Sequence, residues 1–299
     1  MIPTDGTWDP SDRHIYFLAA SLSRQQWACV NHGYVLLAVN DLTDATCEAV
    51  LEPMLDGGTR VLLDSGIFWL TNEHKRRTGM SMNEALALAP TEIEGFDALW
   101  QRYVTIVGRY GSRVWGTIEL DQGGAVNKRK TRAKLRDLGI NPMPVYHPLN
   151  DGAEYFDELA EETDRFCMGN VVQADRRTRV RLLASLWERH RKYPDLWVHV
   201  LGLTPNQVLN AYPCDSADSS TWLNVVRWAG YGEKAMLRPV SPMDPDYKYV
   251  IGDTADDSPS SDKRSLAMSA AGMTMNQLGW RHWQDRIQEG LDLPCYPAP

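Results

Sequence analysis

Two carboxylates lie three residues apart in the stretch 214–222, written CDSADSSTW, among small hydroxyl residues. Asp and Ser accept backbone N–H bonds at helix starts, so the simplest interpretation of an isolated pair is a capping turn. Two other apolar runs also end on an acid, Asp64 and Asp121, and a further run ends at His147. Paired carboxylates can divide nucleophilic and acid–base work between them, provided that the fold brings them together.

The elements that would position these residues are short apolar runs with helical stretches between most of them. Several runs are continuous rather than alternating, which favours a parallel sheet buried on both faces. The runs are residues 15–20, 34–40, 60–64, 114–121, 143–147, 165–169, 196–202 and the approach to 214–218. Amphipathic helices are expected over residues 83–109, 126–138 and 175–193.

Strand–helix alternation repeated to about eight units predicts an α/β protein with a (β/α)8 TIM barrel. A doubly wound sheet is the alternative, but no GxGxxG motif follows an early strand. We expect a single domain over residues 1–299, with the barrel core at about 15–230. The remaining residues, 231–299, are expected to form a C-terminal helical extension, with an exposed loop at 252–262 and a helix at roughly 263–289.

Composition excludes several classes of protein. The chain has 299 residues, of which 43% are hydrophobic and 23% charged, enough for a sizeable core. No apolar run approaches the roughly 20 residues that span a bilayer, and the N-terminus lacks the pattern of a secretory signal, so no membrane partner is expected. The five cysteines form no CxxC pair, which argues against structural zinc and disulfides. Such spacing suits a reducing cytoplasm, that of the host if a phage encodes the chain.

The net charge of −8 argues against nucleic acid, but the positive charge is unevenly placed. Three clusters of Lys and Arg follow expected strands and become important if the fold brings them to one side. They are Lys75, Arg76 and Arg77; then Lys128, Arg129, Lys130, Arg132, Lys134 and Arg136; and finally Arg176, Arg177, Arg179 and Arg181.

The C-terminal ends of barrel strands are where TIM-barrel chemistry takes place. In chain order these ends carry Asn40, Asp64, Asp121, His147, Gly169, Leu201 with Gly202, and Asp218. Any single acid there is more simply a helix N-cap. Three Asp converging on one mouth together with a His predict a functional site.

These residues resemble a known family. Residues 64–68, DSGIF, are similar to the Asp-Ser-Gly-Gly-Phe/Tyr motif of the tRNA-guanine transglycosylases. Residues 215–219, DSADS, match that family's Asp-x-x-Asp segment, whose second Asp is the nucleophile. Asp121 matches a strand end carrying a base-recognising Asp, and residues 199–203 resemble a segment ending in Met-Gly-Val. The resemblance covers roughly residues 15–230 in the same strand order.

The departures from the family pattern point to one of its branches. Ile67 replaces the second Gly of the first motif, and His147 occupies the position of a base-reading Gln. The four-ligand Cys/His zinc site has no counterpart, and no C-terminal RNA-binding domain is expected. In lacking these features, the chain resembles the short enzymes of phages and bacterial modification islands that insert 7-deazaguanines into DNA.

The resemblance implies exchange of guanine for a 7-deazaguanine such as preQ0, with no cofactor and no metal. A carboxylate nucleophile would hold the sugar covalently between two inversions, a role that falls to Asp218. Asp64 would move the proton, and Asp121 would accept from the N1–H and amine of the base. Phe68 and Leu201 would sandwich the base. The remaining expected base-site residues are Gly169, His147, Gly202 and Asn40.

The expected partner is DNA with its target base flipped out or single-stranded, and a helper protein for opening the duplex is possible. Phosphate contacts are expected from all three basic clusters, and in particular from Lys75, Arg76, Arg77, Lys128, Arg129, Lys130 and Arg132. Three alternatives remain open. They are the same exchange on tRNA, a non-catalytic base-binding paralogue that supports a partner subunit, and a retaining glycoside hydrolase. A hydrolase would usually line its cleft with exposed aromatics rather than arginines, so the basic clusters disfavour it.

Overall fold

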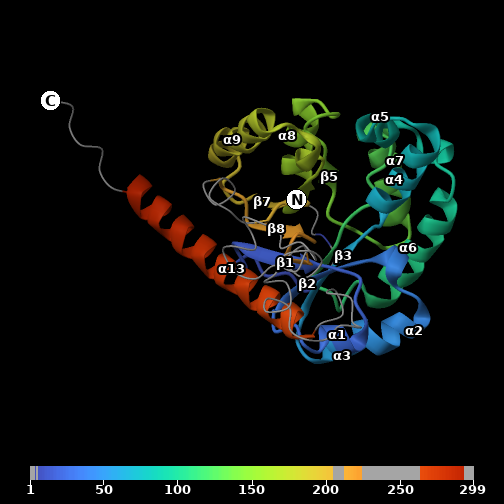
Figure 1. The fold of residues 1–299 in the computed structure, drawn as a ribbon. Helices are drawn as coiled ribbons and strands as arrows, with labels where there is room; N and C mark the ends of the chain where they lie inside the picture. Colours follow the sequence, from blue (N-terminus) through green and yellow to red (C-terminus); the bar gives the residue numbers. More distant parts are fainter. Residues whose placement is uncertain (1–3, 5, 205–211, 224–262, 293–299) are drawn as a thin grey trace, which may run out of the picture.

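The computed structural model describes residues 4, 6–204, 212–223 and 263–292 (Figure 1). Eight strands form one all-parallel sheet in the order β4-β3-β2-β1-β8-β7-β6-β5, so the first and last strands are neighbours. The strands are β1 Ile15–Ala19, β2 Tyr34–Ala38, β3 Arg60–Asp64, β4 Gly116–Thr117, β5 Val145–Tyr146, β6 Arg165–Met168, β7 Trp197–Val200 and β8 Ser216–Ser219. This curled sheet surrounded by helices is the TIM-barrel-like α/β fold that the sequence predicts.

The pairing between strands is least extensive between β4 and β5, which are the two shortest strands. They are joined just beyond β4 by an isolated parallel bridge between Ile118 and Met143. The N–H of Met143 donates to the Thr117 carbonyl at 2.8 Å, and the N–H of Glu119 donates to the Met143 carbonyl at 3.0 Å. These bonds link the two ends of the strand order, so this seam closes the barrel.

Helices follow most strands and cover the outside of the sheet (Figure 1). The α-helices are α1 Arg24–Trp27, α2 Asp44–Thr46, α3 Glu52–Asp56, α4 Ile67–Thr78, α5 Met82–Ala87, α6 Phe96–Tyr110, α7 Gly124–Asp137, α8 Ala153–Glu162, α9 Arg176–Lys192 and α13 Lys263–Asp292. Short 3-10 turns occur at η1 Val39–Asp41, η3 Pro90–Glu92 and η4 Val171–Gln173, and a π-helical turn at η2 Cys47–Leu51.

The helices expected over 126–138 and 175–193 correspond to α7 and α9. A single helix over 83–109 is wrong, because the segment divides into α5, η3 and α6. Pro90 lacks the N–H needed to continue a helix, and Gly95 takes a left-handed φ of 90° just before α6.

In the described part of the C-terminal extension, α13 forms where a helix is expected at roughly 263–289. Figure 1 shows this helix running along one side of the barrel. It is fastened there by Gln277, whose side-chain oxygen accepts from the Tyr16 N–H at 2.8 Å, and by the buried Leu266 and Met273. The loop expected over 252–262 lies outside the described residues. Within the described chain, no helix has both the length and the apolarity needed to cross a bilayer.

The core is organised by the two-residue period of the strands. In β1, Ile15 and Phe17 point into the barrel, while Tyr16 and Leu18 point outward against the helices. The same alternation places one inward residue at every second position of the other strands. The inward cluster consists of Ile15, Phe17, Leu36, Leu62, Trp115, Ile118, Met143, Val145, Cys167 and Trp197. Strand-end residues that share this inward phase therefore point along the barrel axis.

Candidate active site

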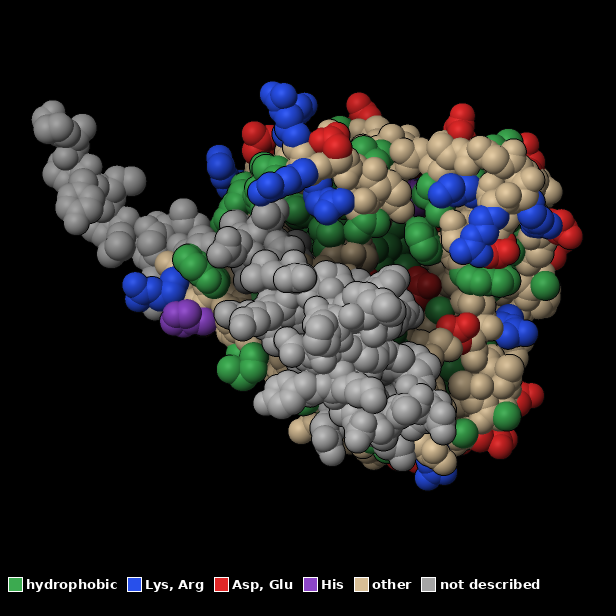
Figure 2. Space-filling view, in the orientation of Figure 1, with side chains coloured by type: hydrophobic (Ala, Val, Ile, Leu, Met, Phe, Trp, Pro, Cys, Tyr) green, Lys and Arg blue, Asp and Glu red, His purple; other side chains and the backbone are tan. Residues whose placement is uncertain are grey.

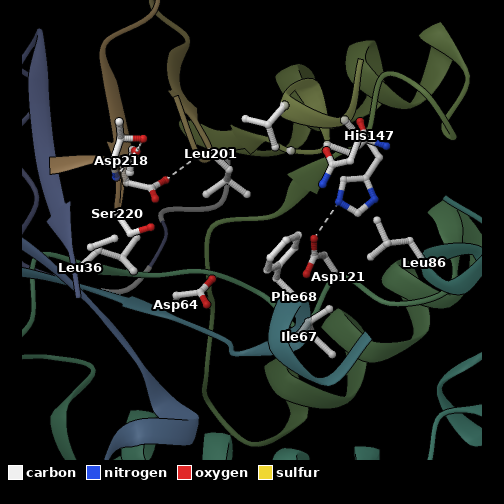
Figure 3. A pocket seen from close by; sticks show the side chains of 18 residues that line it. Leu36, Asp64, Ile67, Phe68, Leu86, Asp121, His147, Leu201, Asp218 and Ser220 are labelled. Carbon is white, nitrogen blue, oxygen red and sulfur yellow. Dashed lines mark hydrogen bonds and ion pairs between the residues drawn. The ribbon is translucent and has the colours of Figure 1, made fainter. Parts of the chain in front are cut away.

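A cavity of about 400 Å³ opens at the C-terminal ends of the strands. The inward phase delivers several of its residues, because Asp64 lies two positions after Leu62 and His147 two positions after Val145. Eight of the residues expected from the sequence line it together, namely Asp64, Phe68, Asp121, His147, Gly169, Leu201, Gly202 and Asp218. Figure 3 shows Asp218 on one side of this cavity and the Asp121–His147 pair on the other. The volume falls in the usual range for small-molecule sites.

Asn40 does not line this cavity, so its expected role in base binding is not supported. Strand β2 ends at Ala38, and the 3-10 turn η1 then carries Asn40 away from the inward phase. Asn40 lines a neighbouring hollow instead. Its Oδ1 lies only 2.4 Å from where a Cβ at residue 66 would stand, so Gly66 is needed for close packing.

The turn after β3 shapes the surroundings of Asp64. Gly66 has a left-handed φ of 81°, and its N–H donates to Asp64 Oδ2 at 3.0 Å. Burial, followed by the negative charge of Asp121, raises the pKa of Asp64 to about 7, and the charge of Asp218 acts in the same direction. Because Asp64 responds to both other acids, the three carboxylates form one electrostatic group.

Asp121 is tied to His147 across the barrel mouth. His147 Nε2 lies 2.7 Å from Asp121 Oδ2 (Figure 3). Burial would raise the pKa of Asp121, but the hydrogen bond and charge of His147, with the charge of Lys128, lower it below its usual value. Asp121 therefore stays an anion, able to accept hydrogen bonds from a ligand. Gly169 leaves room for the imidazole, since a Cβ there would lie 2.8 Å from His147 Cδ2.

Apolar side chains complete the walls of the cavity. Phe68, in the first turn of α4, is 55% exposed although it is a large aromatic residue. Ile67, Leu36 and Leu201 also line the cavity. A flat aromatic ligand could therefore place its ring face against Phe68 and a polar edge against Asp121.

Asp218 is held by two donors on the same oxygen. Its Oδ1 accepts from the Gly202 N–H at 3.0 Å and lies 3.1 Å from His199 Nε2. Gly202 has a φ of 73°, a conformation that favours glycine. Within the described part of the chain, Asp218 Oδ2 accepts no hydrogen bond, and Asp218 lines the cavity.

The sequence interpretation missed two residues that lie in or beside the cavity. His199 lies in an apolar strand, where a histidine is most simply a satisfied core residue, and only its two-residue spacing from Leu201 indicates its inward phase. Gln173 follows the strand end of β6 and lines the cavity. In the described part of the chain its buried Oε1 has no hydrogen-bond partner. Such an atom is available to a ligand.

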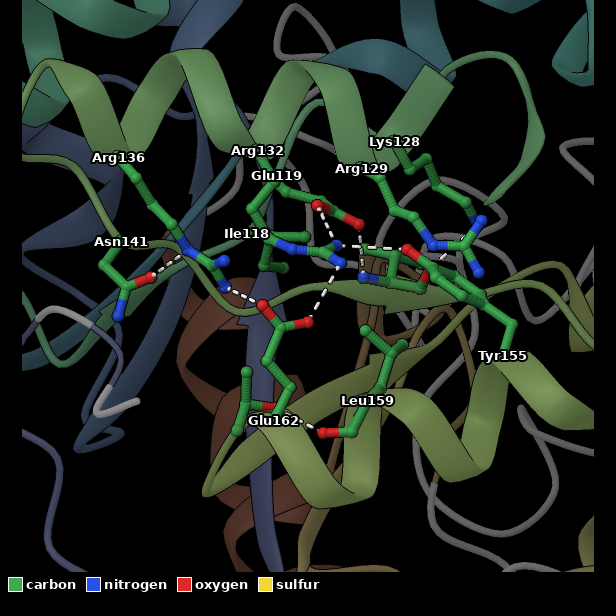
Figure 4. A network of polar contacts seen from close by, with 12 residues as sticks. Ile118, Glu119, Lys128, Arg129, Arg132, Arg136, Asn141, Tyr155, Leu159 and Glu162 are labelled. Atoms are coloured by element: carbon green, nitrogen blue, oxygen red, sulfur yellow. Dashed lines mark hydrogen bonds and ion pairs between the residues drawn. The ribbon is translucent and has the colours of Figure 1, made fainter. Parts of the chain in front are cut away.

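The basic cluster in α7 corrects one expectation. Lys128 is fully buried, donates to the Val145 carbonyl at 2.8 Å and pairs with Asp151 at 2.5 Å. Arg132 is 2% exposed and pairs with Glu119 at 2.8 Å (Figure 4). Neither side chain can reach a phosphate, so their assignment as backbone contacts is wrong. Both instead support β5, because Glu119 also accepts from the Val145 N–H at 2.7 Å.

Most of the other expected phosphate contacts are exposed, and three of them form ion pairs. Arg129 pairs with Glu158, Arg76 with Glu73 and Arg77 with Glu94. Lys75 is half-buried, and Lys130 is exposed. The first cluster lies in the last turn of α4, and a helix of 12 residues places that turn well away from its mouth-facing start.

The third cluster lies closer to the cavity. Arg176 and Arg177 are exposed in the first turn of α9, directly after the cavity-lining turn η4. Figure 2 shows Lys and Arg side chains gathered over α9 on one side of a hollow and near α4 on the other, with an acidic side chain at its bottom. The best-placed exposed cations therefore belong to the third of the basic clusters from which the sequence predicts phosphate contacts.

The fold and site define an α/β barrel with three carboxylates and one histidine facing a single cavity. No group of three or more His, Cys, Asp or Glu in the described ranges is arranged to hold a metal ion. No model of a known protein family matches the sequence, and a search of curated proteins finds no match either.

Proposed function

We propose that this protein is a pentosyltransferase that exchanges guanine in DNA for a 7-deazaguanine through a covalent Asp218–sugar intermediate. The observation that carries the proposal is the joint placement of Asp218, Asp64 and Asp121 around one cavity of suitable size. Each acid has a different environment, as three separate roles require.

The first half of the reaction opens the glycosidic bond. Asp218 Oδ2 attacks C1′ of the flipped-out nucleotide, so a C1′–O bond forms as the C1′–N9 bond breaks. The electron pair of the broken bond goes to the leaving guanine, which takes a proton from Asp64. The sugar is then held as an ester of Asp218. No free oxocarbenium ion forms, so water has no cation to trap.

The second half reverses these steps with the new base. The incoming 7-deazaguanine gives its N9 proton to Asp64, and N9 attacks C1′ to release Asp218. Asp64 must therefore be protonated in one half and ionised in the other. A pKa of about 7, raised first by burial, allows both forms near neutral pH.

Recognition of the base falls to the opposite side of the cavity. The anionic Asp121 accepts from the N1–H and exocyclic amine, which guanine and its 7-deaza analogues share. Phe68 and Leu201 cover the faces of the ring, and His147 lies beside Asp121 at the edge. Arg176 and Arg177 on α9 would contact phosphates of the strand around the flipped nucleotide.

The substrate is tested by incubating the protein with labelled preQ0 and, in separate reactions, duplex DNA, single-stranded DNA and tRNA. The nucleic acid is then digested to nucleosides. We expect label in DNA. Label in tRNA alone would establish the same chemistry on RNA, and label in none, with preQ0 still bound, would indicate a non-catalytic paralogue.

The nucleophile is tested with Asp218→Asn. We expect turnover below about a hundredth of wild type with folding and base binding retained, the loss typical of a covalent catalyst. Asp41→Asn is the control, because Asp41 lies in the neighbouring hollow and not in the cavity. Substantial turnover by Asp218→Asn would remove this residue from the mechanism.

A further inference from the structure

A short hydrogen-bonded chain lies inside the barrel directly below the cavity. Ser216 and Asp218 share the inward phase of β8, and His199 of β7 stands in register with Ser216. His199 Nδ1 lies 2.5 Å from Ser216 Oγ, and its Nε2 lies 3.1 Å from Asp218 Oδ1. Both His199 and Ser216 are completely buried.

The chemistry of the three groups fixes the imidazole tautomer. An ionised carboxylate only accepts hydrogen bonds, so Nε2 must carry the proton that faces Asp218. In a neutral ring Nδ1 is then a bare acceptor, and the Ser216 hydroxyl can donate to it. The opposite tautomer would place two lone pairs against each other at Asp218.

The surrounding aromatic residues leave the ring little freedom to turn. Phe17 meets the His199 ring edge-on with centroids 5.8 Å apart. The Trp197 ring is parallel to it, with an interplanar angle of 4° and centroids 6.5 Å apart. The donor at Nε2 is therefore held in place before any ligand enters.

We infer that His199 is a positioning residue for the nucleophile, an inference that rests on the proposed function. His199 and the Gly202 N–H both bind Oδ1 of Asp218, which turns Oδ2 toward the cavity as the attacking atom. His199 is not among the residues lining the cavity. Its loss should therefore slow formation of the sugar ester and leave base binding unchanged.

The experiment compares His199→Gln with His199→Asn in the full chain. Gln places its amide nitrogen as many bonds from Cα as Nε2, so it can still donate to Asp218. Asn places its amide at the distance of Nδ1, so it can meet Ser216 but not Asp218. The two variants are both neutral amides, and each therefore serves as the other's control. Ser216→Ala is a third variant. It leaves His199 in place but removes the hydroxyl that holds the proton of the imidazole on Nε2.

Three quantities are measured for each variant: the thermal midpoint, the Kd for preQ0, and the rate at which single-stranded DNA carrying the target base forms a covalent adduct. We expect His199→Asn to form the adduct about 10- to 100-fold more slowly, the usual effect of losing a hydrogen bond to a charged group. His199→Gln should stay within several-fold of wild type, and Ser216→Ala should fall between them. The Kd for preQ0 should not change.

Each outcome decides the matter. Equal rates in the Gln and Asn variants, or a parallel loss of preQ0 affinity, would show that His199 is only a packing residue. If His199→Asn does not fold, the Gln and Ser216→Ala variants still test the inference, since unchanged rates in Ser216→Ala would refute the tautomer lock. A wild-type protein that forms no adduct and exchanges no base would refute the proposed function, and this inference with it.

Discussion

Replacing Asp64 by Asn should make the protein more stable at high pH and leave it nearly unchanged at low pH. In the folded chain, burial and then the charge of Asp121 raise the pKa of Asp64 from 3.8 to about 7. The folded state therefore binds a proton more tightly than the unfolded state. Stability is lost as pH rises from about 4 to about 7, because ionising the carboxyl is unfavourable only in the folded protein.

The size of the effect follows from the two pKa values. A change from 3.8 to about 7 corresponds to about 4 kcal/mol above pH 7, at ~1.36 kcal/mol per pKa unit. Asp64 is partly open to the cavity, so water reduces this figure. Asn keeps an oxygen that can accept the Gly66 N–H, so the turn itself should survive. We expect the advantage of Asp64→Asn over wild type to grow by about 2 kcal/mol between pH 5 and pH 8.

The measurement is urea unfolding of wild type and Asp64→Asn at one-unit intervals from pH 5 to pH 8. Asp175→Asn is the control, because hydrogen bonds from Thr178 lower the pKa of Asp175 and both of its pKa values then lie below this range. Asn also serves well as a helix N-cap, so this variant should differ from wild type by a constant amount. A constant difference for Asp64→Asn as well would refute a raised pKa at the cavity.

Four further predictions follow from the site and its supports. Lys128→Ala leaves Asp151 buried and unpaired, so it should lower the free energy of unfolding in urea by about 3–5 kcal/mol, whereas the exposed Lys130→Ala should change it by less than ~0.5 kcal/mol. Gly169→Ala should push His147 aside and raise the Kd for preQ0 in calorimetry without a comparable loss of stability. Replacing Arg176 and Arg177 together by Ala should flatten the log–log salt dependence of DNA binding by about one slope unit per lost phosphate contact. Dialysis against a chelator should leave the thermal midpoint and exchange activity unchanged, and elemental analysis showing one zinc per chain would contradict this.

The strands and the inward phase of their ends could be predicted from the sequence because apolar runs and the period of two are local signals. The place of Asn40, which lies outside the cavity, shows where such signals stop. A 3-10 turn begins one residue after β2, and nothing in residues 34–40 distinguishes this turn from another strand position. In contrast, Pro90 and Gly95 were visible in the sequence as helix breakers, and the helix expected over 83–109 did not take account of them.

Burial of charge could not be predicted from the run of Lys and Arg alone. The partners of Lys128 and Arg132 are Asp151 and Glu119, which lie 23 and 13 residues away and belong to other elements. One local signal existed, because Lys128, Arg132 and Leu135 recur at helical spacing and all face inward. A basic residue on the same stripe as a buried Leu is a candidate for an internal ion pair.

The main chain of His147 is held in place independently of its side chain. The His147 N–H donates to Asp151 Oδ2 at 2.8 Å, and Asp151 is in turn anchored by Lys128. None of these bonds involves the imidazole, so another side chain at this position would meet the cavity from the same strand end. Under the proposed function, substitutions at residue 147 would therefore change which base edge is accepted without disturbing the bonds that hold the strand end. If the protein exchanges bases as proposed, a change of preferred 7-substituent would need few mutations, and residue 147 is the position at which to begin.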